Sequence, residues 1–152
     1  MRVFVLGSGS SGNCLVVEAE GERLLIDAGM GPTRATARMR ALGADLVTSR
    51  APLALFVTHD HGDHAAHALP LARALRAPLH AHAGIRLDRG AKRVQVVPYV
   101  PGRPVVLGPF TVESVVIPHD APQIAIRVSA VGTVGSAIST DLPRTGRPRE
   151  TW

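Results

Sequence analysis

Thr58-His59-Asp60-His61-Gly62-Asp63-His64 is the stretch from which the fold of this chain can be inferred. It supplies four potential metal ligands. It lies between an apolar run at residues 53–57, which predicts a buried strand, and residues 65–75, which have the pattern of a helix. Neutral imidazole and carboxylate are the ligands expected for zinc and similar divalent metals. Four potential ligands within six residues are poorly explained as separate core or surface residues. The stretch therefore predicts a metal site at a strand-to-helix junction.

The spacing within this stretch brings its ligands to one point. His59 and His61 are two residues apart, which puts both side chains on the same side of an extended backbone. Asp63 and His64 fall where the helix is predicted to begin, and the turn of the chain there lets them face the same point from another direction.

The pattern His-x-His-x-Asp-His after a buried strand resembles the signature of the metallo-β-lactamase-fold hydrolases, and residues 58–64 fit it without a mismatch. The resemblance covers residues 1–142. It implies an α/β protein of αββα sandwich type, in which two β-sheets lie between layers of helices. The chain would hold the first half of this fold and the start of the second, as an incomplete domain over residues 1–142 followed by an irregular tail rich in Pro and Arg over residues 143–152.

The same resemblance implies two divalent metal ions, zinc most simply, with manganese or iron as alternatives. His119 and Asp141 each follow a predicted strand, at residues 110–117 and 136–140, and the family places metal ligands at such strand ends. The implied ligands of the first metal are His59, His61 and His119. The implied ligands of the second are Asp63, His64 and Asp141, with Asp141 shared. Asp63 is also expected to be catalytic, by orienting or deprotonating the nucleophile.

Metals in such a site lower the pKa of bound water from about 15.7 towards 7, which makes hydroxide available at neutral pH. The expected activity is therefore metal-dependent hydrolysis. A phosphodiester, as in nucleic acid, suits two metals because charge builds up on both flanking oxygens. The alternatives are hydrolysis of small thioesters, lactones or β-lactams, or an inactive truncated remnant.

Residues 7–12 formally match G-x-G-x-x-G after a strand, which invites a dinucleotide-binding interpretation. That fingerprint requires a helix after the glycines, whereas residues 14–19 have a strand pattern, so we expect a tight loop near the site instead. Asp27 ends the third predicted strand, and in the family an Asp here supports the metal-binding loop by hydrogen bonding. Residues 7–14 and Asp27-Ala28-Gly29 together resemble one bacterial branch, the WalJ/YycJ-like proteins, which is associated with phosphodiester or nucleic-acid hydrolysis.

The composition fits one folded domain, with 45% hydrophobic and 19% charged residues. The formal charge of +5 is weak support for a nucleic-acid partner. A single cysteine, Cys14, excludes an internal disulfide and is expected to be a core residue. The N-terminus lacks the pattern of a signal peptide and no apolar stretch is long enough to span a membrane, so we expect a cytoplasmic protein without a membrane partner.

Three further histidines, His67, His80 and His82, are expected to be structural rather than ligands. After Leu142 the family pattern would continue with more strands and a last His ligand, whereas this chain ends in the Pro/Arg-rich tail. We therefore expect either a truncated or shifted reading frame or a partner that supplies the rest. We also expect the apolar faces at residues 15–17 and 124–126 to be partly open to water, which would favour self-association.

Overall fold

A computed structural model of the chain describes residues 1–43, 51–87, 93–117, 123–132 and 136–139. The predicted tail at residues 143–152 therefore lies outside the described residues. The helices are α1 (Pro32–Ala41), α2 (Gly62–Ala65) and α3 (Ala68–Leu75). The strands are β1 (Arg2–Gly7), β2 (Cys14–Ala19), β3 (Glu22–Ile26), β4 (Ala54–Phe56), β5 (Leu79–Ala81), β6 (Val96–Pro98), β7 (Val105–Leu107), β8 (Phe110–Ile117), β9 (Gln123–Ala130) and β10 (Ser136–Ser139).

The first sheet has six strands in the order β1-β2-β3-β4-β5-β6. Its first three strands pair antiparallel, and β2 and β3 are joined by a tight turn in which Glu20 and Gly21 both have positive φ. From β3 to β6 the pairing is parallel. The carboxyl ends of these parallel strands therefore meet at one edge of the sheet, and residues 58–64 follow β4 at this edge.

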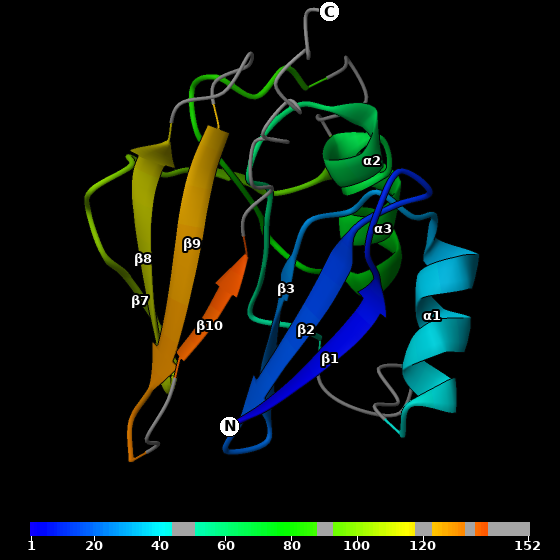
Figure 1. Cartoon of the computed structure of the whole chain (residues 1–152), viewed down its shortest axis with the longest axis horizontal. Helices are drawn as coiled ribbons and strands as arrows, with labels where there is room; N and C mark the ends of the chain where they lie inside the picture. The colour runs from blue at the N-terminus through cyan, green and yellow to red at the C-terminus, as the bar shows by residue number, and fades with distance from the viewer. Residues whose placement is uncertain (44–50, 88–92, 118–122, 133–135, 140–152) are drawn as a thin grey trace, which may run out of the picture.

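The second sheet has four antiparallel strands in the order β10-β9-β8-β7. It faces one side of the first sheet, while α1 and α3 lie against the other side, as Figure 1 shows. The order of layers is thus helices, first sheet, second sheet. The α/β fold class predicted from the sequence is confirmed, and within the described residues no helix covers the outer face of the second sheet.

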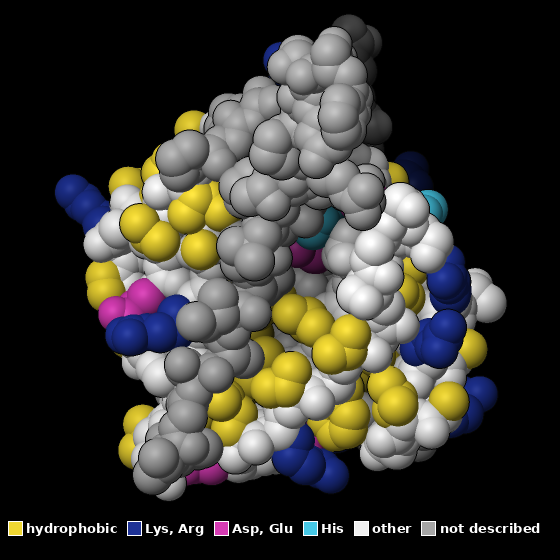
Figure 2. Space-filling model, in the orientation of Figure 1, with side chains coloured by type: hydrophobic (Ala, Val, Ile, Leu, Met, Phe, Trp, Pro, Cys, Tyr) yellow, Lys and Arg dark blue, Asp and Glu magenta, His cyan; other side chains and the backbone are white. Residues whose placement is uncertain are grey.

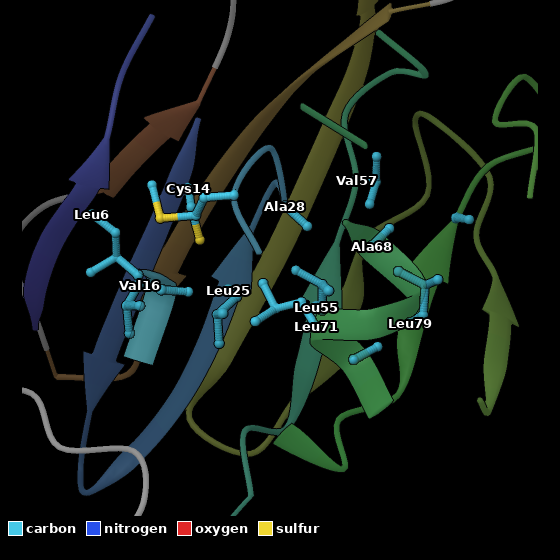
Figure 3. Close-up of a cluster of buried hydrophobic side chains, with 14 of the residues drawn as sticks. Leu6, Cys14, Val16, Leu25, Ala28, Leu55, Val57, Ala68, Leu71 and Leu79 are labelled. Carbon is cyan, nitrogen blue, oxygen red and sulfur yellow. The ribbon is translucent and has the colours of Figure 1, made fainter. Parts of the chain in front are cut away.

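Alternating residues of the first sheet supply two hydrophobic cores. Leu55 packs towards the helices, in a cluster with Val16, Leu25 and Leu71 (Figure 3). Its neighbours Ala54 and Phe56 face the second sheet, where they meet Phe110, Ile124 and Ile126 among others. A strand that is buried on both faces has to be apolar throughout, which explains the run that precedes the motif.

The expectation that residues 15–17 and 124–126 are open to water is wrong for most of them. Val16, Val17, Ile124 and Ile126 are fully buried, while Leu15 and Ala125 are half-buried. The reason is that this chain itself contains both sheets, so their inner faces cover each other. The exposed apolar residues are elsewhere and include Val106 and Val115 in the second sheet.

The helix predicted over residues 65–75 is two helices, separated by a turn at Ala66 and His67. This break places Pro70 in the first turn of α3, where a missing N–H does no harm. The helical spacing of Ala35, Met39 and Leu42 predicts a helix over residues 33–42 with these three on its apolar side. In α1 Ala35 and Met39 are buried, but Leu42 is exposed because the helix ends before it. Gly43 follows with a φ of 74° and donates its N–H to the Arg40 carbonyl, as glycines that end helices commonly do.

Within the described residues, no helix has the length and apolar character that would be needed to cross a membrane.

Candidate metal centre

The candidate centre lies where β3 and β4 end side by side. Asp27 directly follows β3, and its N–H donates to the Phe56 carbonyl at the end of β4 (2.8 Å). The ladder between the two strands thereby extends to the first residue of the loop. Thr58 then begins the motif, with both Thr58 and His59 fully buried.

The three motif histidines lie together. The ring centroid of His59 is 4.7 Å from that of His61 and 4.1 Å from that of His64. His61 is the N-cap of α2, and its carbonyl accepts the N–H groups of His64 and Ala65. The short helix thus turns the chain back on itself, which brings His64 beside His59 as the spacing predicted.

Asp27 is the hub that holds this arrangement. Its Oδ1 accepts the Thr58 N–H (2.9 Å) and the Thr58 hydroxyl (2.9 Å), and its Oδ2 pairs with His64 Nδ1 (2.8 Å). The carboxylate is buried, and the residue has a φ of 64°, a conformation that Asp tolerates better than most residues. The expectation that Asp27 supports the loop through hydrogen bonds therefore agrees with this geometry.

These bonds leave the Nε2 atoms of His59 and His64 as the ring nitrogens that could face a metal ion. A carboxylate can only accept, so His64 carries its proton on Nδ1, where it bonds Asp27. The Thr58 hydroxyl donates its single proton to Asp27, so its oxygen accepts a proton from His59 Nδ1 (3.0 Å). Metal-binding histidines in proteins have this arrangement, in which the other ring nitrogen is held by a carboxylate or another acceptor.

Thr58 also links the motif to the second sheet. Its carbonyl accepts the Ile124 N–H of β9 (3.2 Å) and lies 3.1 Å from His82 Nε2. His82 Nδ1 accepts the Gly84 N–H, so Nε2 is the nitrogen that donates. His82 is therefore a structural residue that reinforces the loop.

His80 and His67 also lie apart from the motif rings. His80 stacks on Phe56 between the sheets with centroids 4.5 Å apart, and burial lowers the pKa of His80. His67 is the N-cap of α3, and its N–H bonds the Ala28 carbonyl. Both fit the structural role that we expected for them.

Sequence reasoning missed Asn13, because nothing in the sequence connects it to residues fifty positions away. Its backbone N–H donates to the Asp63 carbonyl (2.7 Å), and its side-chain Nδ2 lies 3.0 Å from His64 Nε2 and 3.3 Å from Asp63 Oδ2. Gly29 completes the contact by donating its N–H to the Asn13 carbonyl. The glycine-rich loop that was predicted to approach the site therefore contacts it through the residue that follows the glycines.

Cys14, next to Asn13, does not belong to the candidate ligands. It is fully buried, and burial together with the charge of Asp27 raises the pKa of its thiol to about 12. A metal-binding cysteine must be a thiolate. The core role that we expected for Cys14 is confirmed.

The predicted ligands His119 and Asp141 lie outside the described residues. Among the residues that the structure does describe, no three His, Cys, Asp or Glu side chains form a complete metal-binding group. Asp63 Oδ2 and His64 Nε2 are 3.8 Å apart, and the Asp63 side chain is 30% exposed. Imidazole nitrogen and carboxylate oxygen are donor types that zinc takes, so these side chains could supply part of its ligand set.

A His side chain and an acidic side chain are visible next to each other on the face of the molecule that Figure 2 shows. A separate cavity of about 180 Å³ is lined by residues that include Asp60, Gly62, Leu69 and Arg86. The exposed Arg86 has its Nε 4.0 Å from Asp60 Oδ2, so a cation lies at the edge of the motif.

The family model of the Metallo-beta-lactamase superfamily matches residues 7–136. The exodeoxyribonuclease WalJ of Streptococcus pneumoniae is 28% identical over 132 residues, which cover 79% of this chain and 46% of that protein. The chain thus spans about half the length of the curated relatives it matches.

Solved structures share the fold at lower identity. The metallo-beta-lactamase fold protein YhfI of Bacillus subtilis has a TM-score of 0.65 at 20% identity, covering 84% of this chain and 57% of that one. A Cronobacter sakazakii metallo-beta-lactamase with a HARLDQ motif has a TM-score of 0.72 at 20% identity, covering 96% and 64%.

Proposed function

Since this chain belongs to the metallo-beta-lactamase superfamily, we propose that it is a metal-dependent hydrolase that cleaves phosphodiester bonds of nucleic acid. The proposal assigns His59, His61 and His119 to a first metal ion. It assigns Asp63, His64 and Asp141 to a second, with Asp141 shared. Zinc is the metal that this donor set favours, and manganese and iron are alternatives.

The observation that carries the proposal is the bracing of the motif histidines through Asp27 and Thr58. Both His59 and His64 have Nδ1 bonded to this pair, so that Nε2 of each is presented in the metal-binding tautomer. The network places a buried carboxylate at Asp27, which has a φ of 64°. A histidine that only fills a core needs no such partner.

The bound metals would supply hydroxide at neutral pH and stabilise charge on the phosphate oxygens. His59 and His64 would act only as ligands, because their remaining nitrogens are held by Thr58 and Asp27. Asp63 is the proposed catalytic residue. Its side chain is 30% exposed, so it can contact water or substrate, and its carboxylate would orient the nucleophile or accept its proton.

Nucleic acid as the substrate is supported by the printed activity of the Streptococcus pneumoniae relative, an exodeoxyribonuclease. The charge of the chain agrees with it. Arg34, Arg38 and Arg40 are exposed on α1, and dark blue side chains gather on that side of the molecule in Figure 2. Arg34 bonds the Ser11 carbonyl (3.0 Å), so this basic helix is attached to the glycine-rich loop beside the motif.

The substrate class is tested by comparing kcat/KM for an activated phosphodiester, a chromogenic cephalosporin and a thioester, with zinc or manganese added. We expect the phosphodiester to be the best substrate, and His61→Ala to abolish its cleavage. A labelled single-stranded DNA should bind, and its affinity should fall steeply as salt rises, because phosphate contacts release counterions. If the cephalosporin or the thioester is cleaved faster, the protein is a hydrolase of small molecules instead.

A further inference from the structure

A cavity lies at the far end of α3, away from the candidate metal centre. It has a volume of about 220 Å³ and is lined by the end of α3, the turn into β5 and the segment that precedes β6. Residues 58–64 follow the carboxyl end of β4, whereas this cavity borders the segments that lead into β5 and β6. Because β4, β5 and β6 are parallel, the motif and the cavity lie at opposite edges of the first sheet.

Three arginines line this cavity, and they come from two separate segments. Arg73 and Arg76 lie at the end of α3, and Arg93 precedes β6. All three are exposed to solvent. The other lining residues are uncharged, namely Ala72, Ala77, Pro78, Val94 and Gln95. Among the described residues no carboxylate lines the cavity, and none of the three guanidinium groups forms an ion pair or a hydrogen bond there.

The end of a helix explains only part of this cluster. Cations are favourable at the carboxyl end of a helix dipole, so Arg73 and Arg76 have a structural reason to be there. Arg93 belongs to another segment, so the helix end does not account for it. Like charges around one cavity repel each other, and an anion bound among them would remove this repulsion.

The backbone holds the two segments that carry the arginines side by side. Arg76 has a φ of 54° and ends α3, with its N–H donated to the Arg73 carbonyl (3.3 Å). The chain then turns into β5, where the Leu79 N–H donates to the Gln95 carbonyl (2.8 Å). Gln95 lies on the same short segment as Arg93, so this bond ties the segment to the end of the helix.

The chemistry and the size of the cavity both fit a phosphate group. Guanidinium groups bind phosphate through paired N–H donors held in a fixed fork. A volume of about 220 Å³ is below the roughly 300–1,000 Å³ of pockets that hold whole small molecules, so one phosphate fits it better than a complete nucleotide.

α3 connects this cavity to the surroundings of the motif. It begins shortly after α2, and its eight residues give it a length of about 12 Å. A nucleic-acid strand that advances about 3.4 Å per phosphate covers this length with about four phosphates. A strand bound at the motif therefore reaches the cavity within a few nucleotides.

We propose that Arg73, Arg76 and Arg93 form a phosphate-binding site, remote from the candidate metal centre, that holds the backbone of the nucleic-acid strand cleaved at the motif. The identity of the strand rests on the proposed function, since a free phosphate compound offers the same chemical group. The consequence is that DNA binding depends on arginines that are at the opposite edge of the sheet from the motif.

The test is the binding of a labelled single-stranded DNA of about 12 nucleotides to the 152-residue chain, measured by fluorescence anisotropy over a range of salt concentrations. Phosphorothioate linkages keep the charge of the DNA and slow its cleavage. Arg73→Gln and Arg93→Gln should each weaken binding about two- to tenfold, which corresponds to one net hydrogen bond. Each should also lower the slope of log affinity against log salt by about 0.7, because one phosphate contact is lost.

Arg103→Gln is the matched control, because Arg103 is exposed in the loop between β6 and β7 and its replacement removes the same charge. It should bind DNA as the wild type does. Arg73 and Arg93 are exposed and lie in separate segments, so if one variant does not fold the other still provides the test.

Pyrophosphate, titrated into the same proteins by calorimetry, separates a strand from a free phosphate compound as the ligand. If Arg73→Gln and Arg93→Gln weaken pyrophosphate binding but leave DNA binding unchanged, the proposed link to the strand is wrong. If both variants match Arg103→Gln with both probes, or the wild type binds neither probe, the arginines are only a solvated surface and the inference is overturned. If the wild type binds pyrophosphate through these arginines but binds no DNA, nucleic acid fails as the substrate in the proposed function, whereas the phosphate site remains.

Discussion

Asp27 is the residue whose removal should do most damage to the candidate centre. In Asp27→Ala the Thr58 N–H, the Thr58 hydroxyl and the His64 Nδ1–H all lose their acceptor in a buried place. A buried donor without a partner lowers the free energy of unfolding by about 1–3 kcal/mol, and water that enters the site can restore part of this loss. We therefore expect a loss of about 2–4 kcal/mol in the free energy of unfolding, or roughly 4–16 °C in Tm for a chain of this size.

Asp27→Asn should weaken metal binding while changing stability little. The amide keeps the shape, tolerates the positive φ and still offers an oxygen to Thr58, so unfolding should change by less than about 1.5 kcal/mol. Its NH₂ group would face His64 Nδ1, which must then become an acceptor, and the imidazole proton moves to Nε2. A protonated Nε2 cannot bind a cation, so zinc affinity at this site should fall at least about 10–100-fold.

The assay combines urea unfolding with a zinc titration for the wild type and both variants. The reasoning is refuted if Asp27→Asn binds zinc as tightly as the wild type while Asp27→Ala costs less than about 1 kcal/mol. A large loss of stability in Asp27→Asn together with unchanged zinc affinity would equally contradict the proposed tautomer.

Three other predictions follow from single positions. Gly29→Ala should disrupt the loop and weaken zinc binding, because the added Cβ would collide with the Asp63 carbonyl. Gly62→Ala is the control, because a Cβ there meets open space and should change little. Circular dichroism and zinc titration compare the two variants. Burial lowers the folded-state pKa of His80, so the unfolded chain takes up a proton first. Stability should therefore fall as the pH drops below about 6.5, and His80→Leu should remove this part of the slope in urea unfolding at pH 5.5 and 7.5. The chain should self-associate through the exposed apolar face of the second sheet. Val115→Lys should reduce this association, as measured by light scattering. Unchanged scattering would show that the contact is elsewhere.

Local patterns in the sequence predicted many of the helices and strands. The apolar run before Thr58 predicted a strand buried on both faces, the periodicity of residues 33–42 predicted α1, and residues 110–117 predicted β8 with its observed bounds. Residues 14–19 form a strand, as expected when the dinucleotide interpretation was set aside. These predictions succeeded because burial and hydrogen bonding within each element leave a periodic signal.

What failed depends on contacts between distant segments. Leu42 has the right spacing for the buried side of α1, but the end of the helix turns it out to solvent. The burial of Val17 depends on a second sheet that begins more than eighty residues later. Asn13 lies within residues 7–14, which resemble a family branch, but no pattern in the sequence indicated its contacts with Asp63 and His64 across the fold.

The central claim is that residues 58–64 form part of a metal site, and metal content tests it most directly. The wild-type chain is grown and dialysed with added zinc, then analysed for zinc per chain beside His61→Ala. We predict zinc bound to the wild type, and loss of the first-site metal in His61→Ala with the fold retained. A folded wild-type chain that carries no zinc after this treatment would contradict the account.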